Sequence, residues 1–116
     1  MHELSLTQSV VELCAARAAE QGKGARVTHV TLEVGVLAAV MPDAMRFCFE
    51  ICTKDTALEG AELEIIEIPG RARCLDCAVE VAVTRLYDTC RCGSANLILI
   101  SGEELKVKQM EVEECV

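Results

Sequence analysis

The sequence predicts an α+β fold in which two helices lie on a small three-stranded sheet and a four-cysteine zinc ribbon is inserted. Two observations carry this prediction. Helical and strand-like periodicities follow one another in the order helix, strand, helix, strand, ribbon, strand. The cysteine pairs fall between the last two strands of the main sheet, so the C-terminal strand returns to that sheet. We therefore expect one α+β domain over residues 1–69 plus 103–116 and a ribbon domain over residues 70–102.

The first element is predicted to be a helix that begins almost at residue 1. Ser5 and Gln8 have the spacing of a capping box, in which each side chain satisfies a backbone donor near the other residue. Gly22 and Gly24 end the helical pattern. The apolar positions that recur at helical spacing are Leu6, Val10, Leu13 and Cys14.

The next element is predicted to be a strand over residues 26–35. Val30, Leu32 and Val34 alternate with polar residues, which indicates a strand with one face against a core. His29 is out of phase with these apolar residues, and we interpret it as solvated.

A second helix is predicted from Pro42 to about Lys54. Proline in the first turn and an acidic Asp43 beside it are typical of a helix N-terminus. Its apolar positions are Met45, Cys48, Phe49 and Cys52. Although Cys48 and Cys52 are spaced as a metal-binding pair could be, we interpret both, like Cys14, as small hydrophobic residues.

Two more strands complete the predicted sheet. Residues 61–68 are rich in Leu and Ile and end at Pro69-Gly70. Residues 105–112 alternate until the pattern slips phase at Met110, which indicates a bulge or a change of face. Cys115, in the acidic tail, is interpreted as a free surface thiol.

The cysteine module has the spacing of a tetrahedral metal site. Cys74 and Cys77 form one pair, and Cys90 and Cys92 form the second pair after twelve intervening residues. Zinc binds four thiolates at roughly 2.3 Å, and each short pair supplies two of them from one turn. Strands over 79–83 and 97–100 would form a small antiparallel ribbon that buries too little surface to fold without the metal.

The second pair is unusual because a single residue separates its thiols. In an extended segment Cys90 and Cys92 point the same way, so both can still reach one ion. A redox pair or a disulfide is the alternative interpretation. A thiol–disulfide enzyme using Cys74 and Cys77 is disfavoured, because β-like residues follow instead of a helix. Hydrolysis by zinc is disfavoured too, because four cysteine ligands leave no position for water.

Composition excludes several partners. The chain has 116 residues and a formal net charge of −8, and its basic residues are too scattered for a nucleic-acid-binding stripe. The sequence contains no run of ~18 apolar residues, the length that a membrane-spanning helix needs. The first residues lack the features of a secretory signal, so we expect a cytoplasmic protein in which paired cysteines bind metal.

The N-terminal Met1-His2-Glu3 has two interpretations. One is a frayed tail. The other is a metal site: the Met1 amine and the amide and imidazole of His2 can chelate Ni(II) or Cu(II), with a Glu3 group completing a square-planar set.

Both cysteine pairs and the N-terminus resemble one known family. Met-His-Glu-Leu-Ser-Leu at residues 1–6, Phe47 to Glu50, Glu59-Gly60, Cys74-x-x-Cys77 and Cys90 to Ser94 are similar to the HypA/HybF family of hydrogenase nickel-incorporation proteins. The resemblance spans nearly the whole chain. The single-residue spacing of the second pair departs from the family pattern and bears on the zinc geometry.

The resemblance implies a nickel metallochaperone, not an enzyme. His2, the Met1 amine and Glu3 would bind Ni(II) as transient cargo, while Cys74, Cys77, Cys90 and Cys92 would hold a structural zinc. The implied partners are a HypB-type GTPase and the large subunit of [NiFe]-hydrogenase, with urease maturation proteins in some members. We expect a monomer or a homodimer. The alternative is a zinc-ribbon adaptor or regulator without a role in nickel delivery.

Overall fold

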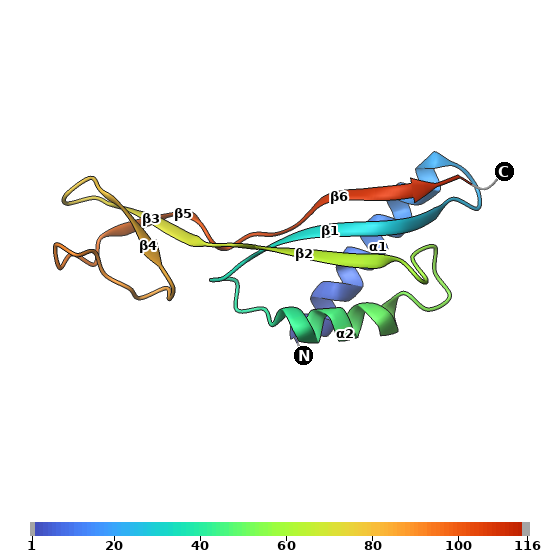
Figure 1. Cartoon of the computed structure of the whole chain (residues 1–116), viewed down its shortest axis with the longest axis horizontal. Helices are drawn as coiled ribbons and strands as arrows, with labels where there is room; N and C mark the ends of the chain where they lie inside the picture. The colour runs from blue at the N-terminus through green and yellow to red at the C-terminus, as the bar shows by residue number, and fades with distance from the viewer. Residues whose placement is uncertain (1, 115–116) are drawn as a thin grey trace. The chain divides into compact units, whose positions relative to one another are not determined.

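The computed structural model describes residues 2–114 of the chain, and only the backbone of His2. Two helices and six strands occur in this part: α1 (His2–Gln21), β1 (Arg26–Gly35), α2 (Pro42–Cys52), β2 (Glu62–Ile68), β3 (Gly70–Cys74), β4 (Glu80–Val83), β5 (Leu97–Ser101) and β6 (Leu105–Glu113) (Figure 1). The strands form two three-stranded sheets, which confirms the α+β prediction. No helix among the described residues is long and apolar enough to cross a membrane.

The chain forms two compact units. The helical unit comprises Met1–Leu32, Val40–Ile66 and Lys106–Val116. The cysteine unit comprises Glu33–Ala39 and Glu67–Leu105. The strands β1, β2 and β6 each contribute residues to both units.

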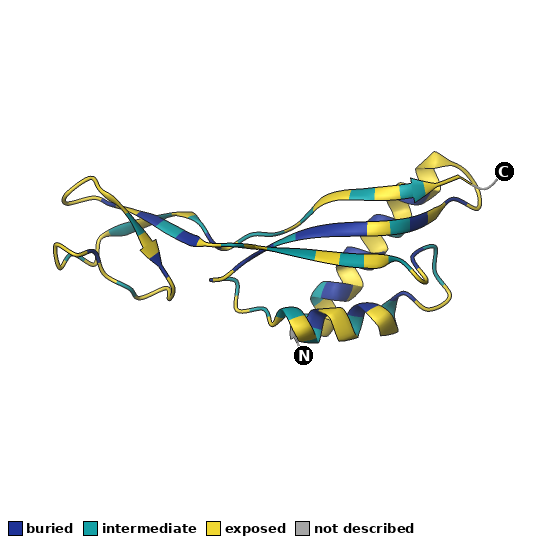
Figure 2. Ribbon diagram, in the orientation of Figure 1, coloured by how far each residue is buried: buried dark blue, intermediate teal, exposed yellow. Residues whose placement is uncertain are grey.

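The helical unit contains the predicted three-stranded sheet. Its strand order is β2-β1-β6, so the C-terminal strand returns to the sheet beside β1, as predicted. The two helices pack on each other, and the centre of the unit is fully buried (Figure 2). The large buried side chains of this unit include Val10, Val30, Leu32, Met45, Phe49 and Leu58.

The start of α1 confirms the prediction of a helix that begins almost at residue 1, because the helix begins at His2. Ser5 therefore lies inside the helix, and its carbonyl accepts a hydrogen bond from Ser9 Oγ at 3.1 Å. The predicted capping box is wrong. The first turn of α1 is instead linked to the residue before α2, because Glu3 Oε2 accepts a hydrogen bond from the Met41 amide at 3.1 Å. The local pattern contained no information about this contact.

The end of α2 and the burial pattern of β6 agree more closely with the predictions from the sequence. Thr53 caps α2, and its amide donates to the Phe49 carbonyl at 3.1 Å. In β6, Lys108 and Gln109 are consecutive exposed residues before the half-buried Met110. This break in alternation confirms the predicted phase slip.

The cysteine unit contains a strand that the sequence did not predict. Its sheet has the order β4-β3-β5, with β3 as the central strand. In the antiparallel register, Ala72 of β3 lies opposite Val81 of β4 and Leu99 of β5. The sequence of β3, Gly-Arg-Ala-Arg-Cys, has a single small apolar residue between its ends, so pairing on both sides, not hydrophobic alternation, makes it a strand. The ribbon therefore has three strands, not two.

The core of the cysteine unit is small and depends on close backbone packing. Leu37, Ala72 and Val83 form its buried cluster. Gly35 approaches Gly102 so closely that a Cβ on Gly35 would lie 2.0 Å from the Gly102 carbonyl oxygen. Only glycine is compatible with this approach.

Candidate metal centre

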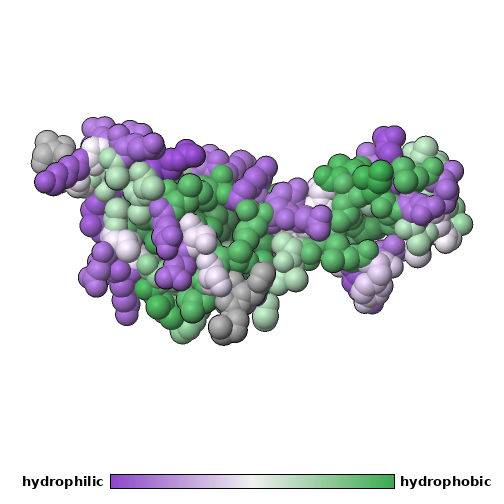
Figure 3. Space-filling model, turned by 180° about the vertical axis from the view of Figure 1, so that it is seen from behind, coloured by the Kyte–Doolittle hydropathy of each residue, from purple (hydrophilic) through white to green (hydrophobic). Residues whose placement is uncertain are grey.

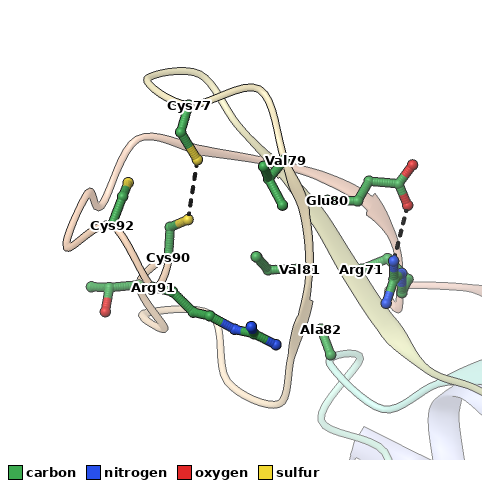
Figure 4. Close-up of a pocket in the computed structure, with 10 residues that line it drawn as sticks. Arg71, Cys77, Val79, Glu80, Val81, Ala82, Cys90, Arg91 and Cys92 are labelled. Atoms are coloured by element: carbon green, nitrogen blue, oxygen red, sulfur yellow. Dashed lines mark hydrogen bonds and ion pairs between the residues drawn. The ribbon is translucent and has the colours of Figure 1, made fainter.

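Four thiols meet at one end of the cysteine unit. The Sγ atoms of Cys74, Cys77, Cys90 and Cys92 all lie within 4.8 Å of one another. Cys74 Sγ lies 3.7 Å from Cys92 Sγ. Cys77 Sγ lies 3.5 Å from Cys90 Sγ, the contact drawn as a dashed line between these two residues in Figure 4. A tetrahedral ion with metal–sulfur bonds of roughly 2.3 Å needs sulfur–sulfur distances of about 3.8 Å. The sulfur positions therefore fit a tetrahedral ion.

Each cysteine pair is held by a tight turn. In the first, the Ala78 amide donates to the Cys74 carbonyl at 2.9 Å, and Ala78 has a φ of 63°. In the second, the Gly93 amide donates to the Cys90 carbonyl at 2.8 Å, and Gly93 has a φ of 90°. The left-handed residue reverses the chain directly after the thiols, so each pair points toward the other.

Polar side chains also link the two turns to each other. Ser94 Oγ, after the second pair, donates to a carboxylate oxygen of Asp76, which lies inside the first pair. Asn96 extends this link: its amide donates to Ser94 Oγ at 3.0 Å and its carbonyl accepts from the Leu75 amide at 2.9 Å. No local pattern in the sequence pairs Asp76 with Ser94, so this link was not predicted.

The single-residue spacing of the second pair does not separate its thiols. Cys90 is buried and Cys92 is exposed, yet both sulfurs belong to the cluster. The first pair is divided in the same way, with Cys74 buried and Cys77 exposed. One side of the cluster consequently faces solvent.

The thiols differ in acidity. The backbone amide of Cys77, despite opposing desolvation, lowers the pKa of Cys74 to about 6, and the Asp76 amide adds to this effect. The Val79 amide lowers the pKa of Cys77, but the neighbouring thiols of Cys90 and Cys74 outweigh it and raise that pKa to about 12. One thiolate is thus favoured in the metal-free cluster, and a bound cation would have to displace protons from the others.

An open cavity of about 670 Å³ adjoins the cluster. Cys77, Cys90 and Cys92 line one part of it, and two arginines, Arg71 and Arg91, line another (Figure 4). Glu80 also lines the cavity and pairs with Arg71 at 3.2 Å, so a cation bound by the thiols would adjoin an open space of mixed charge.

The predicted N-terminal site is described only in part. The backbone of His2 forms the first residue of α1. Met1 and the His2 side chain lie outside the described residues. The Glu3 carboxylate contacts the Met41 amide directly before α2, as described above. The first turn of α1 is thereby held beside the start of α2.

His29, interpreted as solvated, is half exposed but paired. Its Nε2 lies 3.0 Å from Glu62 Oε2, and its Nδ1 lies 2.8 Å from Glu111 Oε2. These carboxylates come from the two strands that flank β1. Their pairing depends on the strand register, which the sequence analysis did not predict.

The other described cysteines do not join a metal cluster. Cys14 is buried, and burial raises the pKa of its thiol despite the nearby Arg17. Cys48 and Cys52 are half-buried on α2. Among the described residues, the four cysteines of the cysteine unit form the only group of three or more histidine, cysteine or acidic side chains whose ligand atoms lie close enough to share a metal ion. Cys115 lies outside the described residues.

The fold and the cluster define a class of protein: a small α+β protein with a cysteine-bound metal module. A family model described as "Hydrogenase/urease nickel incorporation, metallochaperone, hypA" matches residues 1–112. The chain is 53% identical over 117 residues to the hydrogenase maturation factor HypA of Nostoc punctiforme, covering 100% of both chains. It is 53% identical over 114 residues to the factor of the same name from Geobacter metallireducens, covering 97% of this chain and 100% of that one.

Solved structures agree with these matches. A solution structure of the Ni metallochaperone HypA from Helicobacter pylori has a TM-score of 0.66 and 22% identity, covering 94% of this chain and 95% of that one. A solution structure of HypA protein has a TM-score of 0.69 and 25% identity, covering 96% of this chain and 95% of that one. The chain belongs to the HypA family of nickel-incorporation metallochaperones. It is a nickel metallochaperone for hydrogenase maturation, a maturation factor and not an enzyme.

Proposed function

We propose that the chain carries Ni(II) at its N-terminus, through His2, the Met1 amine and a Glu3 group, and holds a structural zinc at Cys74, Cys77, Cys90 and Cys92. The observation that carries the proposal is the presence of two unlike sets of donors in one family member. Four sulfurs lie within 4.8 Å of one another. Nitrogen donors stand at the beginning of the chain.

Zinc fits the sulfur cluster by donor type and spacing. Four thiolates are a structural zinc set, and the distances of 3.5 Å and 3.7 Å between paired sulfurs approach the edges of a tetrahedron around zinc. With all four positions filled by cysteine, the ion would supply folding free energy and no open coordination position. The residues around it orient the thiolates: amides point at the sulfurs, and Asp76 with Ser94 holds the turns together.

Nickel suits the N-terminal donors. An amine, a deprotonated amide and an imidazole form fused chelate rings that favour square-planar Ni(II). The hydrogen bond from Met41 to Glu3 supports this site by anchoring the first turn of α1 at the start of α2. Glu3 would contribute to the site from this anchored turn.

Transfer would proceed by ligand exchange. A partner that approaches an ion bound at a chain end can replace its ligands one at a time, so no covalent bond of a substrate is made or broken. Protons compete with nickel for the same lone pairs, so protonation of His2 and of the Met1 amine as the pH falls would release the ion.

The partners follow from the family. We infer a HypB-type GTPase and the large subunit of [NiFe]-hydrogenase, with urease maturation proteins as a further class of acceptor. Neither nucleic acid nor membrane is among them, since basic residues do not form a continuous stripe. The cytoplasm suits the cluster, because reducing conditions keep thiols available for metal. The functional domains would be residues 1–69 plus 103–116 for nickel and residues 70–102 for zinc, in a monomer or homodimer.

The test compares two histidine variants in untagged protein. His2→Ala is expected to abolish saturable Ni(II) binding in equilibrium dialysis while the zinc content, measured by mass spectrometry of the metals, stays the same. His29→Ala is the matched control, because it removes the only other histidine. Nickel binding that survives in His2→Ala, or the loss of both metals together, would contradict two separate sites.

A second experiment isolates the terminal amine. A peptide tag fused before Met1 converts that amine into an amide, which should weaken nickel binding without changing zinc content. The same tag fused after Val116 is the control. Equal nickel affinity in the two tagged proteins would remove the amine from the site.

A further inference from the structure

Two residues connect sulfurs that belong to different turns. The Asp76 amide donates a hydrogen bond to the Cys74 sulfur, and the Ser94 amide donates one to the Cys92 sulfur. The side chains of Asp76 and Ser94 are joined to each other, because Ser94 Oγ donates to the Asp76 carboxylate. These contacts form a ring around the edge of the cluster between Cys74 and Cys92. We call the pair of residues the Asp76–Ser94 clamp.

Asn96 anchors the clamp to the backbone. Its amide donates to Ser94 Oγ at 3.0 Å, and its Nδ2 donates at 3.5 Å to the Asp76 oxygen that Ser94 also contacts. The Asn96 carbonyl accepts from the Leu75 amide at 2.9 Å, which links the segment before β5 to the first turn. The clamp therefore restricts the position of one turn relative to the other.

Apolar packing contributes little to holding the turns together. Leu75, in the first turn, is 59% exposed, and Val79, directly after it, is 53% exposed. Hydrophobic side chains gather on the surface of the cysteine unit, at the right in Figure 3. The buried cluster of Leu37, Ala72 and Val83 lies outside both turns. The relative position of the turns consequently depends on polar contacts and on a bound ion.

The clamped edge has the length of a tetrahedral edge. With metal–sulfur bonds of roughly 2.3 Å, a tetrahedron places any two sulfurs about 3.8 Å apart, whereas a square plane places neighbours about 3.3 Å and opposite sulfurs about 4.6 Å apart. Cys74 Sγ and Cys92 Sγ are 3.7 Å apart, which agrees with the tetrahedral value. Flattening of the cluster would change this distance and would therefore strain the clamp.

The two ions that the protein is proposed to bind differ in their response to such a restraint. Zn(II) has a filled d shell and no geometric preference of its own, so a tetrahedral set of thiolates suits it. Ni(II) favours square-planar coordination. A frame that resists flattening therefore disfavours nickel and leaves zinc unaffected.

We propose that Asp76 and Ser94 are specificity-determining residues that exclude Ni(II) from the cysteine cluster and so reserve this site for zinc. The inference rests on the proposed function, in which nickel binds at the N-terminus and zinc binds at the four thiols. Nickel retained by four sulfurs would be lost to the donors at the chain end. The clamp acts through the positions of the sulfurs, and neither of its side chains is one of the four metal donors.

The test measures which metal occupies the thiols. Each protein carries His2→Ala, which removes the proposed N-terminal site, and is equilibrated in a chelator-buffered mixture of Zn(II) and Ni(II). Thiolate-to-nickel charge-transfer absorption reports nickel bound to sulfur, and mass spectrometry of the metals gives the zinc content. Ser94→Ala should raise the ratio of nickel to zinc in the cluster about tenfold, the lower end of the effect of outer-shell contacts on metal affinity. An unchanged ratio would overturn the proposal.

Further variants separate the clamp from general stability. Ser94→Thr keeps the hydroxyl group and should keep the original ratio. Asp76→Ala should match Ser94→Ala, and the double variant should add nothing more, because both changes remove the same contact. Ser101→Ala is the matched control, since it removes a hydroxyl that donates to the Pro69 carbonyl at 2.9 Å in the same unit. An equal rise in the control, or loss of zinc without a gain of nickel in the clamp variants, would mark a purely structural role and refute specificity.

The geometry of bound nickel is a readout that a structural role alone would not change. Tetrahedral Ni(II) is paramagnetic and square-planar Ni(II) is diamagnetic, so NMR of nickel-loaded protein distinguishes them. Nickel loaded into the cluster with the clamp intact should broaden the signals of β3 and β5, whereas nickel in Ser94→Ala should leave them sharp. Square-planar nickel with the clamp intact would contradict the inference alone. Failure of the four thiols to bind zinc would contradict the proposed function as well.

Discussion

The helical unit and the cysteine unit reach a folded state by different means. The helical unit buries large side chains from both helices and its central strand, including Leu32, Met45 and Phe49. The buried cluster of the cysteine unit consists of Leu37, Ala72 and Val83. Burial of apolar area contributes about 25 cal/mol per Å², so the second cluster contributes far less than the first. The cysteine unit therefore has only a small hydrophobic core, and its four thiols offer a site where a metal ion could join its turns.

The two units also differ in where their proposed metal donors lie. In the cysteine unit, two turns and the Asp76–Ser94 contact hold four sulfurs that lie within 4.8 Å of one another. At the start of the helical unit, the proposed nickel donors belong to the first residues of the chain. A closed set of four sulfurs favours retention, whereas donors at a chain end favour exchange.

The largest effect is expected from removing the metal. Chelation of zinc, or Cys74→Ala, should unfold the β3-β4-β5 sheet, because zinc binding contributes on the order of 10 kcal/mol to folding of such modules. Hydrogen exchange should show loss of protection in β3 and β5 while α1 and α2 remain protected. Cys48→Ala is the control, since this half-buried thiol lies outside the cluster. Persistent protection of β3 in metal-free protein would show that the unit folds without an ion.

A mutation in the core of the helical unit should destabilise that unit and leave the cysteine unit folded. Met45 on α2 is 0% exposed, so Met45→Ala should destabilise the helical unit by about 2–5 kcal/mol in urea unfolding. Phe47→Ala, two residues away, removes a side chain that is 66% exposed and should change stability by less than about 0.5 kcal/mol. Zinc content should be unchanged in both proteins. Loss of zinc from Met45→Ala would contradict the separation of the two units.

A backbone contact gives a smaller effect within the cysteine unit. Gly35→Ala would place a methyl group 2.0 Å from the Gly102 carbonyl oxygen, and the necessary shift should cost about 1–3 kcal/mol. Val36→Ala trims a neighbouring side chain that is 47% exposed and serves as the control. Urea unfolding monitored by NMR of β3 would measure both. Equal stability of the two variants would mean that the backbone at Gly35 and Gly102 can move apart without a loss of folding free energy.

The smallest effect concerns the turn that follows β4. The Thr84 amide donates to Asp88 Oδ2 at 2.7 Å and lowers the pKa of Asp88, with a further contribution from the Arg85 amide. Because the folded-state pKa lies below the unfolded value, this stabilisation is present above the ordinary carboxyl range and is lost as the pH falls through the lowered pKa. The protection factor of the Thr84 amide, which is the intrinsic exchange rate divided by the observed rate at the same pH, should therefore fall on acidification. Asp88→Asn should remove the acid-dependent change, whereas the exposed Asp43→Asn should not.

The sequence alone predicted much of this molecule. The alternation of Val30, Leu32 and Val34 indicated β1, and the proline and acid at Pro42-Asp43 indicated the start of α2. The spacing of four cysteines indicated a cluster, which the structure assembles. The two helix and strand signals are local, because each depends on residues within a few positions of one another. The cysteine cluster could be predicted for another reason: four paired thiols have few chemical roles other than metal binding.

Only the tertiary structure determined the remainder. The central strand β3 exists because it pairs on both sides, and α1 starts at His2 beside a contact between Glu3 and Met41. The carboxylates around His29 come from strands far away in the sequence. Each of these contacts joins residues that are distant along the chain, so no periodicity records it. Periodicity specifies which face of an element is buried, while register and packing specify what that face meets.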